Sequence, residues 1–554
     1  MKKLLVLGAN IEQIPLIKAA QKEGYEVIVC DYTNSNPGIP LADKHYQVSY
    51  LDQETVLDIA EKEQIDGIIG NSDPAMMIVA FISQRLGLVG NSPESIEKLL
   101  SKSLFRKLQK DCGLYCPRYL EAKDWSETEK ALDDFIYPIM VKPGMCNGSQ
   151  GVTKILSSDL RSHVKDAFQR CKQLSRNGSV IVEEFVEMPS LEIIEGDVFV
   201  NDDTILWNLF TTRRSVLAPM VPMTYIFPSL ISSEETGKVK STLKKLFQKA
   251  GVKHGFYNVE MFFTSKGDLF VIEINPRQGG HNIPNLIELH TGVDCYKLLV
   301  TTAVGDFTYY SSITRVEPAT HFYTQHVVFS KYTGVFDGIV IAPEISKYVV
   351  NLQERNNISQ VFRCTKGSDW LAYVTMCFPD KATQLEYSRE KIEHYISVKV
   401  KDRQIPVVDC SLPYQIIYNF MTGDAYDFFV PKLLKAHRTV EDYAEQFANY
   451  GAIAYVTDSD NNLIGMVSGY VHNLRIPGWS YIAEVYVNSN HRRQGLGKEL
   501  LSAYINYCKS LSLKGVWLNV TENNTPAQNL YKKAGFVFDR SYYENAYLKM
   551  DLSF

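Results

Sequence analysis

Two carboxylates and two amides in one predicted hairpin have the spacing of a cation site. Aromatic and β-branched runs flank a tight turn at Lys266-Gly267, which predicts two antiparallel strands. A turn symmetric about those residues places Glu260 opposite Glu273 and Asn258 opposite Asn275. Because side chains alternate between faces with period two, all four project from one face.

The pairing of two glutamates needs an explanation, because like charges directly opposite each other destabilise a sheet. A bound cation supplies one. Oxygen ligands at this density suit Mg²⁺ held together with phosphate oxygens, and the hairpin has no His or Cys for zinc. Arg277 lies just beyond the second strand. The competing interpretation is an ordinary hairpin with a solvated polar face.

The composition is that of a globular, multidomain protein. The chain has 554 residues, of which 45% are hydrophobic and 22% charged, enough for three or four compact units. A net charge of -5 gives no electrostatic reason to expect nucleic acid or an anionic membrane as partner. The ten cysteines are scattered, the start lacks a signal-peptide cleavage region, and no apolar run reaches transmembrane length. We therefore expect a cytoplasmic protein with reduced thiols.

The first 90 residues alternate short buried strands with amphipathic helices, which predicts a parallel sheet with helices on its faces. The first turn offers only Gly8, so the dinucleotide fingerprint is absent and no NAD site is expected. Asp31 and Asp73 follow the second and third predicted strands. Such folds bind ligands there, although an Asp after a strand is more often a turn or helix-capping residue.

Two lysines and a glycine-bearing loop come next. A helix predicted to begin at the Ser92 cap and to continue to about Gly113 carries Lys102. A buried strand ends at Lys142 and leads into a loop whose glycines would let backbone N–H groups approach phosphate oxygens. The loop residues of interest are Gly144, Gly148, Ser149 and Gly151. A glycine-bearing hairpin without a ligand remains the alternative.

Read together, Lys102, Lys142 with its GSQG loop, EEFV, NVEMFF and EINPR resemble the ATP-grasp superfamily, in particular its carboxylate-amine (amino acid) ligases. The resemblance covers about the first 400 residues and depends on the order of five weak signals. It implies a nucleotide-like N-terminal domain and two ATP-grasp lobes that clamp ATP.

The resemblance also implies a role for each matching residue. Lys102 and Lys142 would contact the ATP phosphates, and Gly148, Ser149 and Gly151 would form the loop over them. Glu183, Glu184 and Val186 would form the hinge that binds adenine, with Glu192 as the ribose candidate. Glu260, Glu273 and Asn275 would hold Mg²⁺ (or Mn²⁺), and Arg277 would face the transferred phosphoryl group or the substrate carboxylate.

The chemistry implied by these roles is amide or peptide bond formation. A carboxylate attacks the γ-phosphate of ATP to give an acyl phosphate and ADP, and an amine then displaces phosphate. This chemistry needs charge neutralisation and alignment more than a protein nucleophile. The partners are therefore a small carboxylic or amino acid and an amine. Because family ligases are often dimers, the resemblance also suggests a homodimer.

The end of the chain contains a second motif set. AEVYVNSNHRRQGLGKELL predicts a strand, a turn with arginines and glycines, and a long helix whose N-terminus could hold a pyrophosphate. GVWLNVTENNTPAQNLYKKAGF follows as a strand, an Asn-rich turn and a short helix. Together these resemble a GNAT-type N-acetyltransferase.

That second resemblance implies acetyl-CoA as a cofactor and an amine as acceptor. The residues that would bind acetyl-CoA are Val487, Arg492, Arg493, Gly495, Gly497, Asn524 and Tyr531. Tyr531 would be the general acid for the CoA thiolate, and Glu484 the base that deprotonates the amine. For Glu484, a solvated strand residue is an equally weighted alternative.

The predicted architecture is α/β and α+β multidomain. We expect a pre-ATP-grasp parallel α/β domain at 1–92, the ATP-grasp core at 93–310, an accessory lobe at 311–405 and a GNAT fold at 406–554. Within 381–400 a helix is expected, and another helical region near 412–449. Two other functions are kept as alternatives: activity on bicarbonate resembling carbamoyl-phosphate synthase or biotin carboxylase, and a non-catalytic protein that senses ATP and acyl-CoA.

Overall fold

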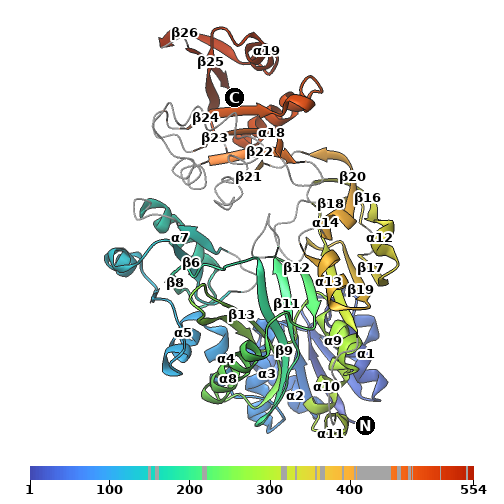
Figure 1. The fold of residues 1–554 in the computed structure, drawn as a ribbon. Coiled ribbons are helices and arrows are strands. Elements are labelled where there is room, and N and C mark those ends of the chain that lie inside the picture. The colour runs from blue at the N-terminus through green and yellow to red at the C-terminus, as the bar shows by residue number, and fades with distance from the viewer. Residues whose placement is uncertain are drawn as a thin grey trace.

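The computed structural model describes most of the chain (Figure 1). The described residues are 1–146, 151–155, 161–214, 221–313, 321–330, 333–355, 358–361, 369–389, 392–404, 407–408, 451–457, 463–471, 476, 478–511, 513–544 and 547–554. Gly148 and Ser149 lie outside these residues, as does the helical region predicted near 412–449. None of the described helices is long and apolar enough to cross a bilayer.

The N-terminal domain is the parallel α/β unit that the alternating pattern predicted. Its strands run in the order β3-β2-β1-β4, all parallel. They are β1 (Lys3–Leu7), β2 (Glu26–Asp31), β3 (Lys44–Gln47) and β4 (Gly67–Gly70), with helices α1 (Ile14–Lys22), α2 (Gln53–Glu63) and α3 (Asp73–Leu86). Strand β3 has the polar sequence KHYQ and lies at the edge of the sheet without a buried residue.

The helix predicted from Ser92 to about Gly113 is in fact two helices, α4 (Pro93–Leu100) and α5 (Lys102–Asp111). Ser92 caps the first as predicted, accepting a hydrogen bond from Ser95 N. Ser101 has extended backbone (ψ 116°) and caps the second helix through Leu104 N. Lys102 therefore occupies the first turn of a helix.

A smaller lobe is built on a four-stranded sheet in the order β5-β8-β6-β7. Its strands are β5 (Tyr119–Ala122), β6 (Ile139–Pro143), β7 (Thr153–Ile155) and β8 (Val180–Glu184), flanked by α6 (Trp125–Ala131) and α7 (Arg161–Leu174). Its core contains Val141 and Val182 packed against Phe168 of α7. Lys142 thus stands at the end of a strand anchored in that core.

A nine-stranded sheet forms the larger lobe, in the order β14-β13-β9-β11-β12-β15-β19-β17, with β10 paired to β9. The strands are β9 (Glu192–Asn201), β10 (Thr204–Leu206), β11 (Leu209–Arg214), β12 (Pro222–Phe227), β13 (His254–Phe263), β14 (Leu269–Asn275), β15 (Phe322–Val328), β17 (Val349–Glu354) and β19 (Ala372–Phe378). The accompanying helices are α8 (Ser233–Ala250), α9 (Ile283–Thr291), α10 (Cys295–Ala303) and α11 (Thr308–Ser312). This sheet continues across the predicted domain boundary at 310/311, and the boundaries themselves stay predictions.

The segment 381–400 was predicted as one helix, and this prediction is wrong in its second half. Two short helices, α13 (Lys381–Ser388) and α14 (Ile392–Tyr395), precede a strand, β20 (Ile396–Gln404). β20 pairs with β16 (Thr333–Ile341), which also pairs with β18 (Gln360–Val361). The alternating sequence ISVKVKD favours a strand, and Ile396 packs with β19 in a core that the sequence does not specify. The short helix α12 (Pro343–Ser346) follows β16.

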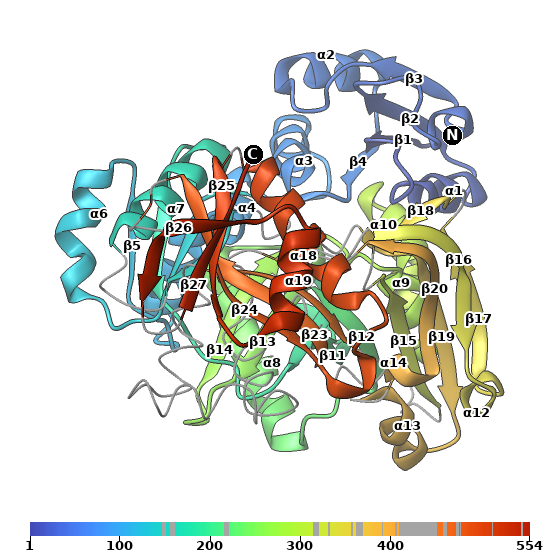
Figure 2. The ribbon, with the colours of Figure 1, turned by 90° about the horizontal axis from the view of Figure 1, so that it is seen from above.

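The C-terminal sheet has the order β21-β22-β23-β24-β25-β27-β26. Its elements are β21 (Val407–Val408), β22 (Gly451–Thr457), β23 (Leu463–Tyr470), β24 (Trp479–Val487), β25 (Gly515–Thr521), β26 (Val537–Glu544), β27 (Tyr547–Ser553), α18 (Leu496–Ser510) and α19 (Thr525–Lys533). Figure 2 shows α18 and α19 lying over this sheet, and side chains of both helices share its core.

Candidate functional site

The predicted metal residues form rows across three neighbouring strands. Glu260 of β13 pairs with Glu273 of β14 and, on its other side, with Glu195 of β9. The next row on the same face begins at Asn258, which pairs with Asn275. The predicted hairpin register is therefore confirmed at these positions, and β9 adds a third carboxylate that the sequence reasoning missed.

The register agrees with the prediction although the turn does not. Phe263 pairs with Leu269, and Thr264 N donates to Asp268 O, so the loop contains three residues with Gly267 at φ +84°. A bulge at Ile272, between the pairs of Glu260 and Met261, offsets the extra loop residue. The two irregularities cancel, and the glutamates face each other as a symmetric turn would place them.

The second row extends to Asp197 of β9, which is fully buried. Its carboxylate accepts from Asn258 Nδ2 at 2.9 Å and from Gly279 N at 2.7 Å. Burial raises the pKa of Asp197 to about 6, although these hydrogen bonds lower it. Asp197 therefore fixes the glycine turn after β14 to the row of metal candidates.

Burial and a buried arginine set the charge state of the first row. Arg214 of β11 forms an ion pair with Glu260 and lies 3.7 Å from Glu195 Oε1. Burial raises the pKa of Glu260 despite Arg214, and burial and the nearby Glu260 raise that of Glu195 well above its ordinary value. For Glu273, burial also acts to raise the pKa. Three other influences are larger together and lower this pKa: the charge of Lys102, the 3.0 Å hydrogen bond from Asn275 Nδ2, and the charge of Arg277. These neighbours therefore favour the ionised form of Glu273.

The two predicted phosphate lysines lie at the same end of the small lobe. Lys102 Nζ donates to Cys146 O at 3.3 Å, and its backbone N donates to Gly144 O at 3.2 Å. Burial lowers the pKa of Lys102, while Glu273 acts to raise it. The structure therefore brings Lys102 near the predicted metal carboxylate.

Lys142 is held by a buried carboxylate. Its ammonium pairs with Glu183, which also accepts from Arg106 Nε at 2.9 Å. Burial alone would raise the pKa of Glu183, but Arg106 and Lys142 outweigh burial and hold it at about 2. Arg106 in turn donates to Ile272 O at 3.1 Å, which joins the small lobe to the bulge in β14. The Glu183 side chain thus positions Lys142.

The other predicted nucleotide residues surround this network. Glu184 accepts from Ile136 N at 3.0 Å, and Val186 packs against a small cluster with Phe262 and Phe270. Glu192, the ribose candidate, pairs with Arg389 Nη2 at 2.9 Å. Gly151 follows the loop at φ +73° and accepts through its carbonyl from Cys171 Sγ. Their roles toward adenine and ribose stay predictions.

Arg277 connects the metal rows to the N-terminal domain. Its Nε donates to Asp73 Oδ1 at 3.0 Å, at the start of α3, and its Nη1 donates to Gln278 O at 2.8 Å. Burial opposes the charge of Arg277, but Asp73 and Glu273 more than compensate and raise its pKa. One arginine therefore faces both the metal candidates and the carboxyl end of a parallel sheet, where such sheets bind ligands.

The residue types fit a magnesium ion bound with phosphate. Glu260, Glu273 and Asn275 are oxygen donors on one face, next to lysine and arginine charges that suit phosphate oxygens. In the part of the chain that the structure describes, no group of three or more His, Cys, Asp or Glu is arranged to hold a metal by itself. Such a site suits Mg²⁺, which is usually held by one or two carboxylates together with substrate phosphates.

The C-terminal site lies where two parallel strands separate. β24 and β25 pair from Trp479–Gly515 to Ile482–Leu518, while β24 continues to Val487. A bulge in β24 opposite Ser468 and Gly469 accompanies this separation. The separation leaves the backbone near Val487 without a partner strand on the β25 side.

The arginine-glycine turn leads directly into α18. Arg492 Nε donates to Val487 O at 2.9 Å, and Arg493 and Gly495 have positive φ of 63° and 87°. Gly497 lies in the first turn, where a Cβ would be 3.6 Å from Val487 Cγ2. The N–H groups of the turn and the positive end of the helix dipole are suited to an anion such as pyrophosphate.

Three other predicted residues complete this region. Tyr531 of α19 is buried, and burial together with nearby Glu484 raises its pKa. Glu484 pairs across strands with Ser468. Asn524 caps α19 by accepting a hydrogen bond from Ala527 N at 3.2 Å. This is a structural role, and an Asn at the start of a helix can have it whether or not it binds a ligand.

Comparisons with known proteins match three parts of the chain. Family models match residues 4–90 (PylC-like, N-terminal domain), 135–285 (ATP-grasp domain) and 419–536 (Acetyltransferase (GNAT) family). The chain combines an ATP-grasp domain with a C-terminal GNAT acetyltransferase domain.

Solved structures share the fold of the ATP-grasp part. The L-amino acid ligase from Bacillus licheniformis has a TM-score of 0.60 at 17% identity, covering 73% of this chain and 99% of that one. Phosphoribosylglycinamide synthetase from Anaerococcus prevotii has a TM-score of 0.56 at 19% identity, covering 72% and 100%.

Curated relatives include the C-terminal section of the carbamoyl phosphate synthase large chain from Aquifex aeolicus, 24% identical over 321 residues (55% of this chain). The large chain from Thermotoga sp. is 28% identical over 301 residues (50% of this chain). The chain spans 58% and 26% of the length of these two relatives.

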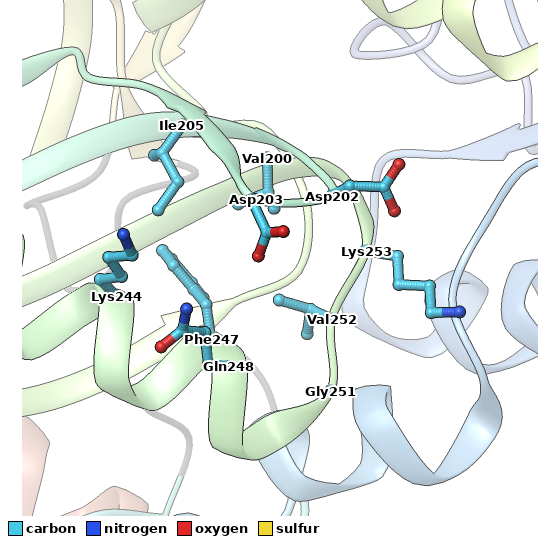
Figure 3. Close-up of a pocket in the computed structure, with 10 residues that line it drawn as sticks. All are labelled: Val200, Asp202, Asp203, Ile205, Lys244, Phe247, Gln248, Gly251, Val252 and Lys253. Carbon is cyan, nitrogen blue, oxygen red and sulfur yellow. The ribbon is translucent and has the colours of Figure 1, made fainter.

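One described pocket lies away from both sites (Figure 3). It has a volume of about 260 Å³ between the β9–β10 turn and the end of α8, with Asp203, Lys244 and Lys253 among its lining residues. These charged side chains are exposed, and Phe247 and Val252 form a buried floor. Because exposed charged side chains lie above a buried apolar floor, this pocket has no evident catalytic or ligand-binding chemistry.

Proposed function

We propose that the ATP-grasp domain is a Mg²⁺-dependent carboxylate-amine ligase and that the GNAT domain acetylates an amine of a small molecule. The observation that carries the ligase proposal is the alignment of Glu260 and Glu273 beside Asn275, with Lys102 and Arg277 acting electrostatically on Glu273. Carboxylates for a metal and cations for phosphate around one point are what phosphoryl transfer requires.

In the ligase reaction, a carboxylate oxygen of the acid substrate attacks the γ-phosphorus of ATP. The bond to the bridging oxygen of ADP breaks, and an acyl phosphate forms. An amine then attacks the acyl carbon, phosphate leaves, and the nitrogen loses a proton to give an amide. When bound, Mg²⁺ supplies charge neutralisation on the phosphate oxygens.

We assign the chain's residues to these steps by their positions. Lys102 and Lys142 hold phosphate oxygens, and Glu183 with Arg106 keeps Lys142 in place. Glu260, Glu273 and Asn275 hold the metal. Arg277, fixed by Asp73, orients either the acid substrate or the phosphoryl group. The hinge, ribose and loop roles of Glu184, Val186, Glu192 and residues 148–151 belong to the same proposal.

In the acetyl transfer, an amine nitrogen attacks the thioester carbon of acetyl-CoA, and the C–S bond breaks. Glu484 receives the proton lost by the amine, and Tyr531 donates its hydroxyl proton to the CoA thiolate. The raised pKa of Tyr531 keeps that hydroxyl protonated at neutral pH. The turn at 492–497 and Val487 hold acetyl-CoA, and we assign Asn524 at the start of α19 to the same binding role.

The experiment that tests the ligase is ADP release from Mg²⁺-ATP against a panel of amino acids and amines, with products identified by mass. We expect ADP only with a particular acid and amine, together with a product whose mass is their sum less water. Glu273→Gln should lower the rate by at least about 100-fold while sparing nucleotide binding. The control Glu234→Gln, on the exposed surface of α8, should leave the rate unchanged. Unchanged activity in Glu273→Gln would remove the metal assignment.

A second candidate function is ATP-dependent activation of bicarbonate. Its support is the similarity to carbamoyl phosphate synthase large chains over about half of this chain. ADP release that requires added bicarbonate, and no amino acid, would favour this function. Nucleotide and acyl-CoA binding without any turnover would instead favour a sensor.

A further inference from the structure

The carboxylate of Glu260 has two cations to serve. It forms an ion pair with Arg214, and the ligase function proposed above also assigns it to the metal. A guanidinium and a divalent cation on one carboxylate repel each other, most strongly where little water screens them. The side chains of Arg214 and Glu260 are only 6% and 20% exposed. A metal on Glu260 therefore favours a movement of Arg214 away from that carboxylate.

The order of the strands decides what lies beside Arg214. Arg214 is at the end of β11, Glu260 is on β13, and β9 lies between these two strands (Figure 1). The Arg214 side chain therefore crosses β9 to reach Glu260. Glu195 of β9 pairs directly with Glu260, so the Glu195 side chain projects from the same face and lies along this path.

One oxygen of Glu195 is in position to receive the guanidinium. Its Oε1 lies 3.7 Å from Arg214 Nη2, which is an ion-pair distance but is longer than a hydrogen bond. The Glu195 side chain is 3% exposed, and among the described residues Oε1 has no hydrogen-bond partner. Buried polar atoms are nearly always hydrogen-bonded in folded proteins, so this oxygen requires a donor. A shift of the Arg214 guanidinium by about 1 Å supplies one.

A purely structural role for Glu195 is the competing explanation. In that case the three side chains would tie β9, β11 and β13 together, and Arg214 would be hydrogen-bonded to both carboxylates. The contacts are instead unequal, because Arg214 Nη2 is paired with Glu260 and stands off Glu195 Oε1. This inequality gives Arg214 two alternative acceptors within reach of one group.

We propose that Glu195 is a positioning residue of the ligase site, whose Oε1 accepts a hydrogen bond from Arg214 Nη2 when Glu260 turns to the metal. The proposal rests on the metal role of Glu260 proposed above. No covalent bond changes and no proton moves, because a carboxyl group keeps an acceptor oxygen whether it is ionised or protonated. Without this acceptor, Arg214 stays on Glu260 and competes with the metal.

The test measures metal affinity, which a purely structural role would leave unchanged. Electron paramagnetic resonance gives the dissociation constant of Mn²⁺ from the full-length protein in the presence of ADP. Glu195→Met keeps a side chain of similar length and removes the acceptor. We expect it to weaken Mn²⁺ binding by about 10-fold or more, the value of one hydrogen bond to a charged group. Glu195→Gln keeps an acceptor oxygen and should bind Mn²⁺ within about 3-fold of the wild type. Glu121→Met, an exposed control on β5, should bind Mn²⁺ as the wild type does.

Thermal unfolding separates the positioning role from the structural one. Replacing a buried polar side chain by an apolar one of similar size is often neutral or stabilising, so Glu195→Met should keep its Tm within about 5 °C of the wild type. Weaker Mn²⁺ binding at an unchanged Tm is the expected result. Unchanged Mn²⁺ binding, with or without a lowered Tm, would overturn the proposal.

Two further variants complete the test. Arg214→Met removes the competing cation, and in that background Glu195→Met should no longer weaken Mn²⁺ binding, since its effect passes through Arg214. A 10-fold effect that persists there would overturn the proposal. If Glu195→Met does not fold, Glu195→Asp retracts the oxygen by one methylene group and should weaken Mn²⁺ binding by about 5-fold, and an unchanged constant would again overturn the proposal. Absence of Mn²⁺ binding by the wild-type protein with ADP would instead overturn the metal role of the proposed ligase.

Discussion

Of the carboxylates in the small ATP-grasp lobe, Glu183 is the one whose removal should lower the free energy of unfolding most. It is 3% exposed and lies between Arg106, also 3% exposed, and Lys142. Glu183→Gln leaves two cations around a neutral amide. Removing one partner of a buried ion pair typically costs about 3–5 kcal/mol, because an uncompensated charge remains.

The pKa of Glu183 gives an independent magnitude for this loss of stability. The pKa falls from an ordinary 4.5 to about 2 in the folded protein. At 1.36 kcal/mol for each pKa unit, this difference corresponds to about 3 kcal/mol. Because the folded pKa is the lower one, the stabilisation is fully present above about pH 4.5 and is lost as the pH falls toward 2. Between pH 6 and 8 it should be constant.

Hydrogen exchange measured by mass spectrometry tests this for peptides covering β6 and β8. A loss of about 3 kcal/mol should speed their exchange by about 100-fold in Glu183→Gln. The neighbouring Glu184→Gln is the matched control, since Glu184 is half-buried and accepts one backbone hydrogen bond, and it should change exchange by less than about 5-fold. Equal effects of the two variants at pH 7 would refute the reasoning.

Three further predictions follow from the two sites. Tyr531→Phe should lower kcat for acetyl transfer by about 100-fold. Because the pKa of Tyr531 is raised, the wild-type rate should not fall on the alkaline side below about pH 10. A fall in rate below that pH would contradict the assignment of Tyr531 as general acid. Gly279→Ala places a Cβ 2.9 Å from Asp197 Oδ1, so it should lower kcat/KM for ADP release about 10-fold or more without preventing folding, as circular dichroism would confirm. Asp73→Ala leaves Arg277 without its 3.0 Å partner and should raise KM for the acid substrate more than it lowers kcat; an effect on neither constant would remove the orienting role.

Local sequence patterns were sufficient for the candidate cation face. Alternation of side chains fixes which residues share a face, so Glu260, Glu273 and Asn275 were placed together before the structure was known. The turn type was wrong, since Gly267 at φ +84° closes a three-residue loop. The bulge at Ile272 restored the predicted pairing.

The same local reasoning failed where two structures compete for one segment. The stretch 381–400 has helix-forming residues at its start, and the strand β20 follows only because β16 offers it a partner. The predicted helix after Ser92 breaks at Ser101, where a hydroxyl that caps the next helix competes with helical hydrogen bonding.

The sequence by itself determined the order of domains, the type of most elements and the chemistry present on each face, because these depend on neighbours within a few residues. Only the tertiary structure decided which charges meet. Arg106 reaches Glu183 across 77 positions, and Asp73 reaches Arg277 across 204. Such pairs depend on strand order, register and lobe packing. Many distant segments contribute at once to the free energy of folding that decides these three features. For the same reason the position of Glu195 beside Glu260 became visible only in the folded sheet.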